Sequence, residues 1–199
     1  MDPARAAALL DFLALADRLK TVERRGLVPL PGGGARRENS AEHCWNLALI
    51  AVLLHREVAA EIDLGHALSL IAVHDLVEIE AGDTYAYDPA GRATQAERET
   101  AAAAIVFGAL PVDLGRTLRA LWEEFEAGAT PEARFAMGCD RMQGFLQNVL
   151  SDGAAWRAHG VTRADTAPRM DPAMAVDPAF ATLIGALYGR ARAGGMLPE

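Results

Sequence analysis

Cysteine is scarce in this 199-residue chain, which has only Cys44 and Cys139. Two thiols are too few for a disulfide framework, so we expect a reducing compartment, the cytoplasm. Long apolar runs are also lacking. The stretch LALIAVLL stops at His55, far short of the roughly 18 residues of a membrane span. Three aspartates interrupt the first 17 residues, so we expect neither a signal peptide nor a membrane partner.

Basic residues are fewer than acidic ones. The chain has 19 Lys and Arg against 27 Asp and Glu, a net charge of −8, which argues against a nucleic-acid polymer as partner. Residues 1–37 differ, with seven basic residues against four acidic ones. This basic segment is equally consistent with a site for a small anion and with a solvated helix face.

Alternating strand patterns are scarce as well, and helical spacing of apolar residues dominates. The length suits one domain with a sizeable core. We therefore predict an all-α bundle of roughly six to eight helices, forming a single domain over residues 1–199.

Capping residues predict where these helices begin and end. The expected helices are a stripe from Leu9 to Leu19 that Gly26 ends, a capping box Asn39–Glu42 opening a helix to about Arg56, a helix from about Leu64 to Ala81 before Gly82, a capping box Thr94–Glu97, a helix from Pro111 to Gly128, one beginning at Thr130-Pro131-Glu132, and one from Asp177-Pro178 to near Gly194. We expect a flexible loop at PLPGGGARR (29–37) and irregular structure over 152–176.

Three of these helices turn an imidazole or a carboxylate toward the core. His43 shares a helical face with Leu47 and Ile50, and Asp75 shares one with Leu68 and Ile71. On the helix that begins at Thr130, Asp140 aligns with the small residues Ala133 and Ala136. A buried carboxylate without a partner costs several kcal/mol. A core histidine bonded to a neighbouring aspartate is one solution.

A divalent cation is the other solution. It would satisfy four side chains together: His43, His74, Asp75 and Asp140. Two imidazoles and two carboxylates suit Mn, Fe, Co, Ni or Zn and leave positions open for water and substrate.

Three motifs occur in the order H…HD…D: ENSAEH (38–43), HDLVEIEAGD (74–83) and the aspartate of GCDRM (138–142). In these motifs the chain resembles the HD-domain phosphohydrolases over about residues 9–150, followed by a C-terminal helical extension over about 151–199. With RLKTVERRG (18–26) it resembles their 5′-deoxynucleotidase branch more narrowly. The resemblance implies a helical HD-domain bundle, one divalent metal, commonly a homodimer, and removal of phosphate from nucleoside 5′-monophosphates by attack of a metal-activated water.

Site residues follow from the same resemblance. It implies His43, His74, Asp75 and Asp140 as metal ligands, Glu78 and Asp83 as acidic catalytic residues, and Arg24 as the phosphate-binding arginine. We expect Glu78 to orient the water or take its proton. Asp83 would protonate the leaving oxygen or position the sugar. We expect the cation to be one of Mn, Co, Fe, Ni, Zn and Mg, without a preference among them.

Two alternatives stay open. Besides the 5′-monophosphate hydrolase, the chain could be an HD hydrolase of another phosphorylated nucleotide (a triphosphate, a cyclic nucleotide or a hyperphosphorylated guanosine) or a non-catalytic helical dimer with a structural metal. Arg25 stands where the nucleotidases carry tryptophan, which leaves the base and sugar preference open. The expected partner is a small phosphorylated substrate, a nucleotide.

Overall fold

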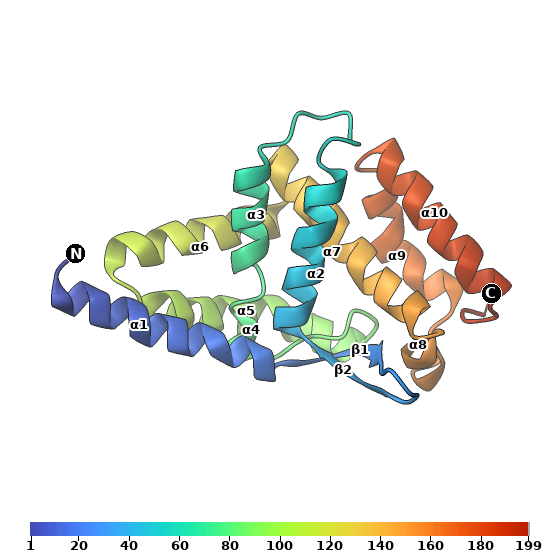
Figure 1. Cartoon of the computed structure of the whole chain (residues 1–199), viewed down its shortest axis with the longest axis horizontal. Helices are drawn as coiled ribbons and strands as arrows, with labels where there is room; N and C mark the ends of the chain where they lie inside the picture. Colours follow the sequence, from blue (N-terminus) through green and yellow to red (C-terminus); the bar gives the residue numbers. More distant parts are fainter. Residues whose placement is uncertain (199) are drawn as a thin grey trace.

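The computed structural model describes residues 1–198 of the chain, and α-helices dominate it (Figure 1). The helices are α1 (Pro3–Asp17), α2 (Ser40–Leu54), α3 (Leu64–Val73), α4 (Glu78–Ala81), α5 (Pro89–Gly108), α6 (Val112–Ala127), α7 (Pro131–Leu150), α8 (Ala154–Ala158), α9 (Arg163–Met174) and α10 (Pro178–Ala193). Within the described residues, α4 and α8 are about one turn long and the others have ten residues or more. The predicted all-α class is confirmed. Glu199, at the end of the expected domain, lies outside the described residues, and the single-domain organisation stays a prediction.

A small β-hairpin interrupts the helices after α1. Its strands β1 (Glu23–Pro29) and β2 (Ala35–Asn39) pair antiparallel, with Leu27 opposite Arg37. The prediction of a loop over 29–37 was therefore wrong in part, because both ends of this segment belong to strands. The prediction that Gly26 ends a helix was wrong, because Gly26 lies inside β1. Gly32, Gly33 and Gly34 have positive φ, which turns the chain between the strands at little steric cost.

Several predicted helix boundaries are confirmed. Asn39 and Glu42 form the capping box of α2, and Thr130 and Asp177 cap α7 and α10 through their side chains. Gly128 ends α6 in the left-handed conformation. These caps satisfy backbone N–H and C=O groups that the first and last turns leave without helical partners.

Other boundaries were wrong. Helix α5 begins at Pro89 with Asp88 as its cap, so Thr94 lies inside the helix. The helix expected from Leu64 to Ala81 is split, because α3 ends at Val73 and residues 74–77 form turns before α4. The turn carries two of the expected metal ligands.

The C-terminal region is more regular than predicted. Residues 152–176, expected to be irregular, contain α8 and α9, and α9 opens with a capping box of Thr162 and Asp165. Pro168 and Pro172 lie inside α9. Proline usually breaks a helix because it lacks an N–H donor, which explains the wrong prediction.

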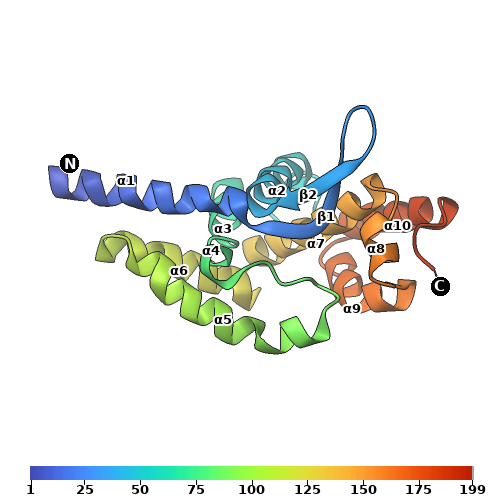
Figure 2. The same cartoon turned by 90° about the horizontal axis from the view of Figure 1, so that it is seen from below.

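Helix α7 is the central element. It packs against α2, α3, α6, α9 and α10, and Figures 1 and 2 both place it between the α5–α6 pair and the C-terminal helices. Its buried aromatics Phe135 and Phe145 belong to the main core. Helix α1 projects from the body (Figure 2), and no helix within residues 1–198 is long and apolar enough to cross a membrane. The packing of α7 with α2 and α3 thus holds near one another the expected ligands on α2, on α7 and in the turn after α3.

Candidate active site

The packing of α2, α3 and α7 brings the predicted metal ligands together. His43 lies on α2, His74 and Asp75 follow α3, and Asp140 lies on α7. One ligand atom from each of His43, His74 and Asp75 lies within 4.8 Å of the others. Asp140 is not part of that trio, but its Oδ1 lies 3.0 Å from His43 Nε2.

Both histidines are oriented through their Nδ1 atoms. His74 Nδ1 lies 2.8 Å from the carbonyl oxygen of Ile71, which can only accept, so Nδ1 donates. His43 Nδ1 donates to Gln143 Oε1 at 2.5 Å, because the amide group of Gln143 donates to the Glu38 carboxylate. A donor at Nδ1 leaves a lone pair at each Nε2.

These Nε2 atoms are buried, and neither has a hydrogen-bond partner of proper geometry in the described residues. Each nevertheless lies 3.0 Å from a carboxylate oxygen, His43 from Asp140 and His74 from Asp75. A nitrogen lone pair and a carboxylate oxygen repel each other unless a proton or a metal cation lies between them. This arrangement fits a cation, and imidazoles fixed through the other nitrogen are usual among metal ligands.

The protonation of the histidines also suits a cation. Burial, with a smaller effect of the Arg24 charge, lowers the pKa of His43 to about 4. Burial likewise lowers the pKa of His74. Both imidazoles are therefore neutral near pH 7, which is the form that binds a metal.

Glu78 and Asp83, the expected catalytic acids, lie beside this cluster. Glu78 is buried and accepts a hydrogen bond of 2.6 Å from Ser40 Oγ. Burial and the neighbouring Asp75 charge raise the pKa of Glu78 well above its usual value. Burial also raises the pKa of Asp83, against the opposing charge of Arg24. Both groups line one cleft of about 230 Å³ together with His74, Asp75 and Asp140.

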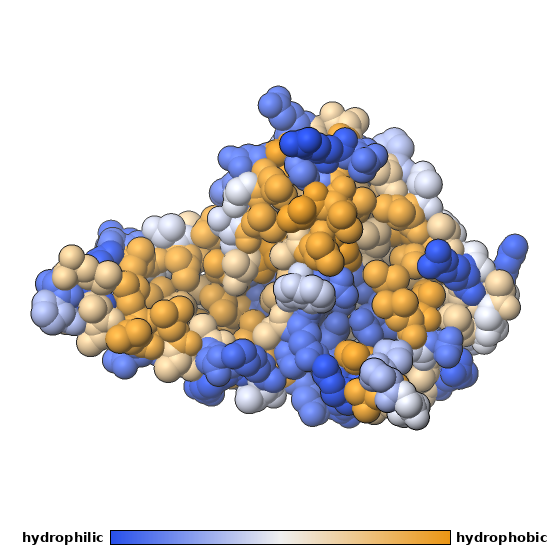
Figure 3. Space-filling model, in the orientation of Figure 1, coloured by the Kyte–Doolittle hydropathy of each residue, from blue (hydrophilic) through white to orange (hydrophobic). Residues whose placement is uncertain are grey.

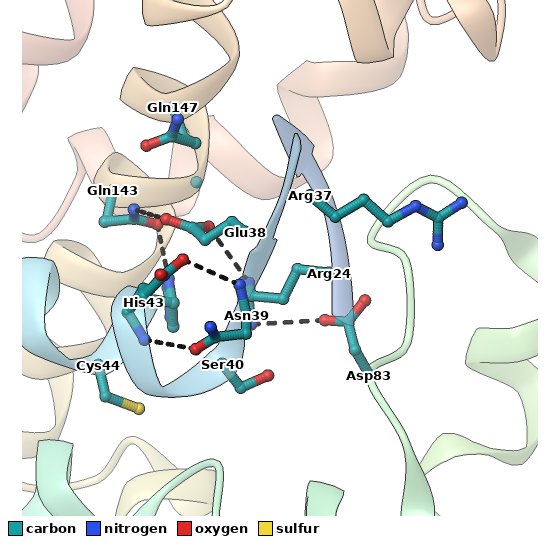
Figure 4. A network of polar contacts seen from close by, with 12 residues as sticks. Arg24, Arg37, Glu38, Asn39, Ser40, His43, Cys44, Asp83, Gln143 and Gln147 are labelled. Atoms are coloured by element: carbon teal, nitrogen blue, oxygen red, sulfur yellow. Dashed lines mark hydrogen bonds and ion pairs between the residues drawn. The ribbon is translucent and has the colours of Figure 1, made fainter. Parts of the chain in front are cut away.

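Arg24 reaches into the cluster from β1 and contacts three carboxylates. Its Nη1 lies 3.3 Å from Asp75 Oδ2. The same atom lies 3.4 Å from Asp83 Oδ1, and Nε lies 3.6 Å from Glu38 Oε2 (Figure 4). Although burial opposes the change, the charges of Asp75, Glu78 and Asp83 raise the pKa of Arg24. The positive charge of the guanidinium thus balances part of the negative charge of the carboxylates around it.

Two members of this network were missed in the sequence. Figure 4 shows Gln143 between His43 and Glu38, and its Nε2 donates to Glu38 Oε1 at 2.8 Å. Glu38 links on to Arg24. The signals were present, because Glu38 opens the ENSAEH motif and Gln143 lies one helical turn after Asp140.

Arg169 was also missed. Its Nη2 lies 3.0 Å from Asp140 Oδ2. Although burial acts in the opposite direction, Arg169 and His43 hold the pKa of Asp140 well below its usual range. No sequence motif indicates a role for Arg169, which lies on α9 in the region that we expected to be irregular.

Comparison with known proteins agrees with this geometry. A family model described as HD domain matches residues 16–176, so the chain belongs to the HD-domain family. It is 31% identical over 142 residues to the human protein named 5'-deoxynucleotidase HDDC2, covering 71% of this chain and 67% of that protein. It is 26% identical to the fission yeast 5'-deoxynucleotidase hdd1, over 74% of each chain.

Solved structures point the same way. A predicted metal-dependent phosphohydrolase from Magnetospirillum magnetotacticum MS-1 is 38% identical and superposes with a TM-score of 0.88, covering 98% of this chain and 96% of that one. The PH0347 protein of Pyrococcus horikoshii OT3, with 18% identity and a TM-score of 0.61, shares the fold. The resemblance to HD-domain phosphohydrolases is confirmed.

Proposed function

We propose that this chain is a metal-dependent phosphohydrolase that removes phosphate from nucleoside 5′-monophosphates. The observation that carries the proposal is the pair of buried Nε2 atoms of His43 and His74, each 3.0 Å from a carboxylate oxygen and without a hydrogen-bond partner of proper geometry in the described residues. The relatives named 5'-deoxynucleotidase support the choice of substrate.

The proposed metal ligands are His43, His74, Asp75 and Asp140. A bound divalent cation supplies positive charge against the phosphoryl oxygens and lowers the pKa of water. Mn, Co, Fe, Ni, Zn and Mg are the candidates, since nitrogen and oxygen donors serve several of them. Gln143 and the Ile71 carbonyl keep the two Nε2 atoms aimed at the centre.

The chain's own acids are proposed to handle the protons. Glu78, held by Ser40, orients the attacking water or takes its proton. Asp83, whose pKa is raised by burial, protonates the leaving 5′-oxygen or positions the sugar. Arg24 stabilises charge on the phosphoryl oxygens, because it lies between Asp75 and Asp83 at the cleft.

We also propose that the chain forms a homodimer. Figure 3 shows hydrophobic residues gathered over α2 on one face of the molecule. Trp45, Leu49, Val52 and Leu53 of α2 are all exposed, and their spacing places them on one helical face. A contiguous apolar surface of this kind marks an interaction site. We propose a second copy of the chain as the partner, because the resemblance to HD-domain phosphohydrolases implies a homodimer.

The direct test is phosphate release from a panel of ribo- and deoxyribonucleoside monophosphates, with Mn, Co, Mg or Zn added in turn. We expect metal-dependent release from 5′-monophosphates. No release from any member of the panel would contradict the proposal and favour a structural metal in a non-catalytic protein.

A further inference from the structure

A second cavity of about 70 Å³ lies next to the cleft described above. We call it the side pocket. The two share part of their walls, because Arg24, Asp83, Arg141 and Arg169 line both. We refer to the four proposed metal ligands, His43, His74, Asp75 and Asp140, as the metal cluster. These ligands do not line the side pocket. Its volume is several times the roughly 10–15 Å³ that one water needs, so it has room for a larger group.

The side pocket is positively charged in an acidic protein. Four arginines line it (Arg24, Arg25, Arg141 and Arg169) against two carboxylates (Glu38 and Asp83). Both carboxylates are within 3.6 Å of Arg24. Among the lining residues the arginines thus outnumber the carboxylates by two, in a chain of net charge −8, although Arg24 and Arg169 also contact Asp75 and Asp140 outside the lining. A hollow lined by one sign of charge concentrates ions of the other sign.

Two of these arginines lack an acidic partner. Among residues 1–198, neither Arg25 nor Arg141 lies within 4.0 Å of a carboxylate, whereas Arg24 and Arg169 do. Arg141 is half-buried and Arg25 is exposed. A partly desolvated guanidinium is unfavourable without a counter-charge, and an anion in the side pocket would supply it.

Tyr85 adds a donor from another segment. Its hydroxyl is buried, has no hydrogen-bond partner in the part of the chain that the structure describes, and belongs to a residue lining the side pocket. Burial raises the pKa of Tyr85, so the phenol stays protonated and can donate to an oxygen. An unpartnered O–H beside unpaired guanidinium groups suits the oxygens of an oxyanion.

We propose that the side pocket binds a second phosphate group, next to the one that is hydrolysed, through Arg25, Arg141, Arg169 and the Tyr85 hydroxyl. The phosphate group comes either from the substrate itself, a nucleotide with two separate phosphate groups, or from inorganic phosphate. The first source rests on the proposed function. The second does not, and the two are separated below.

The first experiment titrates the metal-loaded full chain with inorganic phosphate by calorimetry. The variants are Arg141→Gln and Tyr85→Phe. The control is Arg134→Gln, an exposed arginine of the same helix whose Nη1 donates to the Ala129 carbonyl. We expect both pocket variants to weaken one phosphate-binding event about tenfold or more, since a charge-assisted hydrogen bond is lost. Identical titrations for wild type, pocket variants and control would overturn the proposal.

The second experiment compares kcat/KM for a nucleoside 3′,5′-bisphosphate and the matching 5′-monophosphate. A preference of about tenfold for the bisphosphate that disappears in Arg141→Gln places the second phosphate on the substrate. Equal kcat/KM values in wild type, with phosphate binding still weakened in the variants, assign the side pocket to inorganic phosphate. A preference that persists in both variants contradicts the proposal. Failure to hydrolyse either nucleotide contradicts the proposed function, and the titration then decides on the side pocket alone.

Discussion

The metal cluster and the side pocket share part of one wall, yet they satisfy their polar groups in opposite ways. In the cluster every imidazole has its Nδ1 bonded, and only the two Nε2 atoms are left without a partner in the described residues. In the side pocket whole guanidinium groups, those of Arg25 and Arg141, lack an acidic partner within residues 1–198. Contacts within the fold therefore orient the imidazoles of the cluster. The charges of Arg25 and Arg141 in the side pocket, by contrast, would be balanced only by the proposed phosphate.

Burial explains why the two regions differ. His43 is fully buried and Gln143 holds it, so a small error in position would be costly. Arg25 is exposed and Arg141 half-buried, so water can solvate their charges until a ligand arrives. The cluster is suited to a resident ion and the side pocket to an exchanging one.

Removing one proposed ligand should have the largest effect. We expect Asp140→Ala to lose the bound metal and to reduce turnover to background, because the cation loses a carboxylate and Arg169 is left without its partner. Elemental analysis and phosphate release measure both quantities. The control Asp113→Ala removes an exposed carboxylate that pairs only with Arg5 in the described structure. Wild-type metal content in Asp140→Ala would remove Asp140 from the centre.

Glu78→Ala should separate chemistry from metal binding. We expect full metal content and turnover lower by about two to four orders of magnitude, as general-base catalysis is lost. Glu80→Ala, on the same short helix, is the matched control because Glu80 is exposed and pairs with Arg18. Normal turnover in metal-loaded Glu78→Ala would exclude Glu78 from the mechanism.

Gln143→Leu tests whether the fixed imidazole explains the difference between the two regions. We expect metal affinity to fall about 10- to 100-fold, because His43 Nδ1 loses its acceptor. Titration with a competing chelator measures the affinity. Gln95→Leu, which removes an amide bonded to Glu99 at 2.8 Å in the same cleft, should leave it unchanged. Equal affinities in the two variants would show that the Gln143 bond is dispensable.

The smallest effect on turnover is expected far from both regions. Leu53→Glu places a charge in the exposed apolar face of α2, where Leu53 is 64% exposed. We expect a dimer-to-monomer change in light scattering, with turnover per chain altered by no more than about twofold. Leu10→Glu, at a residue 67% exposed on α1, is the control. A wild-type chain that is already monomeric would contradict the proposed homodimer.

Much of the metal cluster was predictable from sequence. His43 and Asp140 lie on faces of α2 and α7 that also carry core residues, so helical periodicity predicted that they point inward. Asp75 is buried as expected, but it lies in the turn after α3. Capping boxes with side-chain acceptors located α2, α7 and α10 because the rule is local and chemical.

The rest depends on contacts between segments far apart in the chain. Glu38 and Gln143 are 105 residues apart, and Arg169 reaches Asp140 from 29 residues away. No local pattern records such pairs. The β1–β2 hairpin was missed because its strands carry arginines and a glycine rather than alternating apolar residues. Helix α9 was missed because its two prolines resemble helix breakers.

The most direct test of the metal cluster is a crystal structure of the chain prepared without chelator, with anomalous scattering recorded at the absorption edge of the metal found by elemental analysis. We predict one anomalous peak about 2.0–2.3 Å from His43 Nε2 and His74 Nε2 and in contact with Asp75 and Asp140. A cation bound elsewhere, or none in protein that still releases phosphate from nucleoside 5′-monophosphates, would contradict the account.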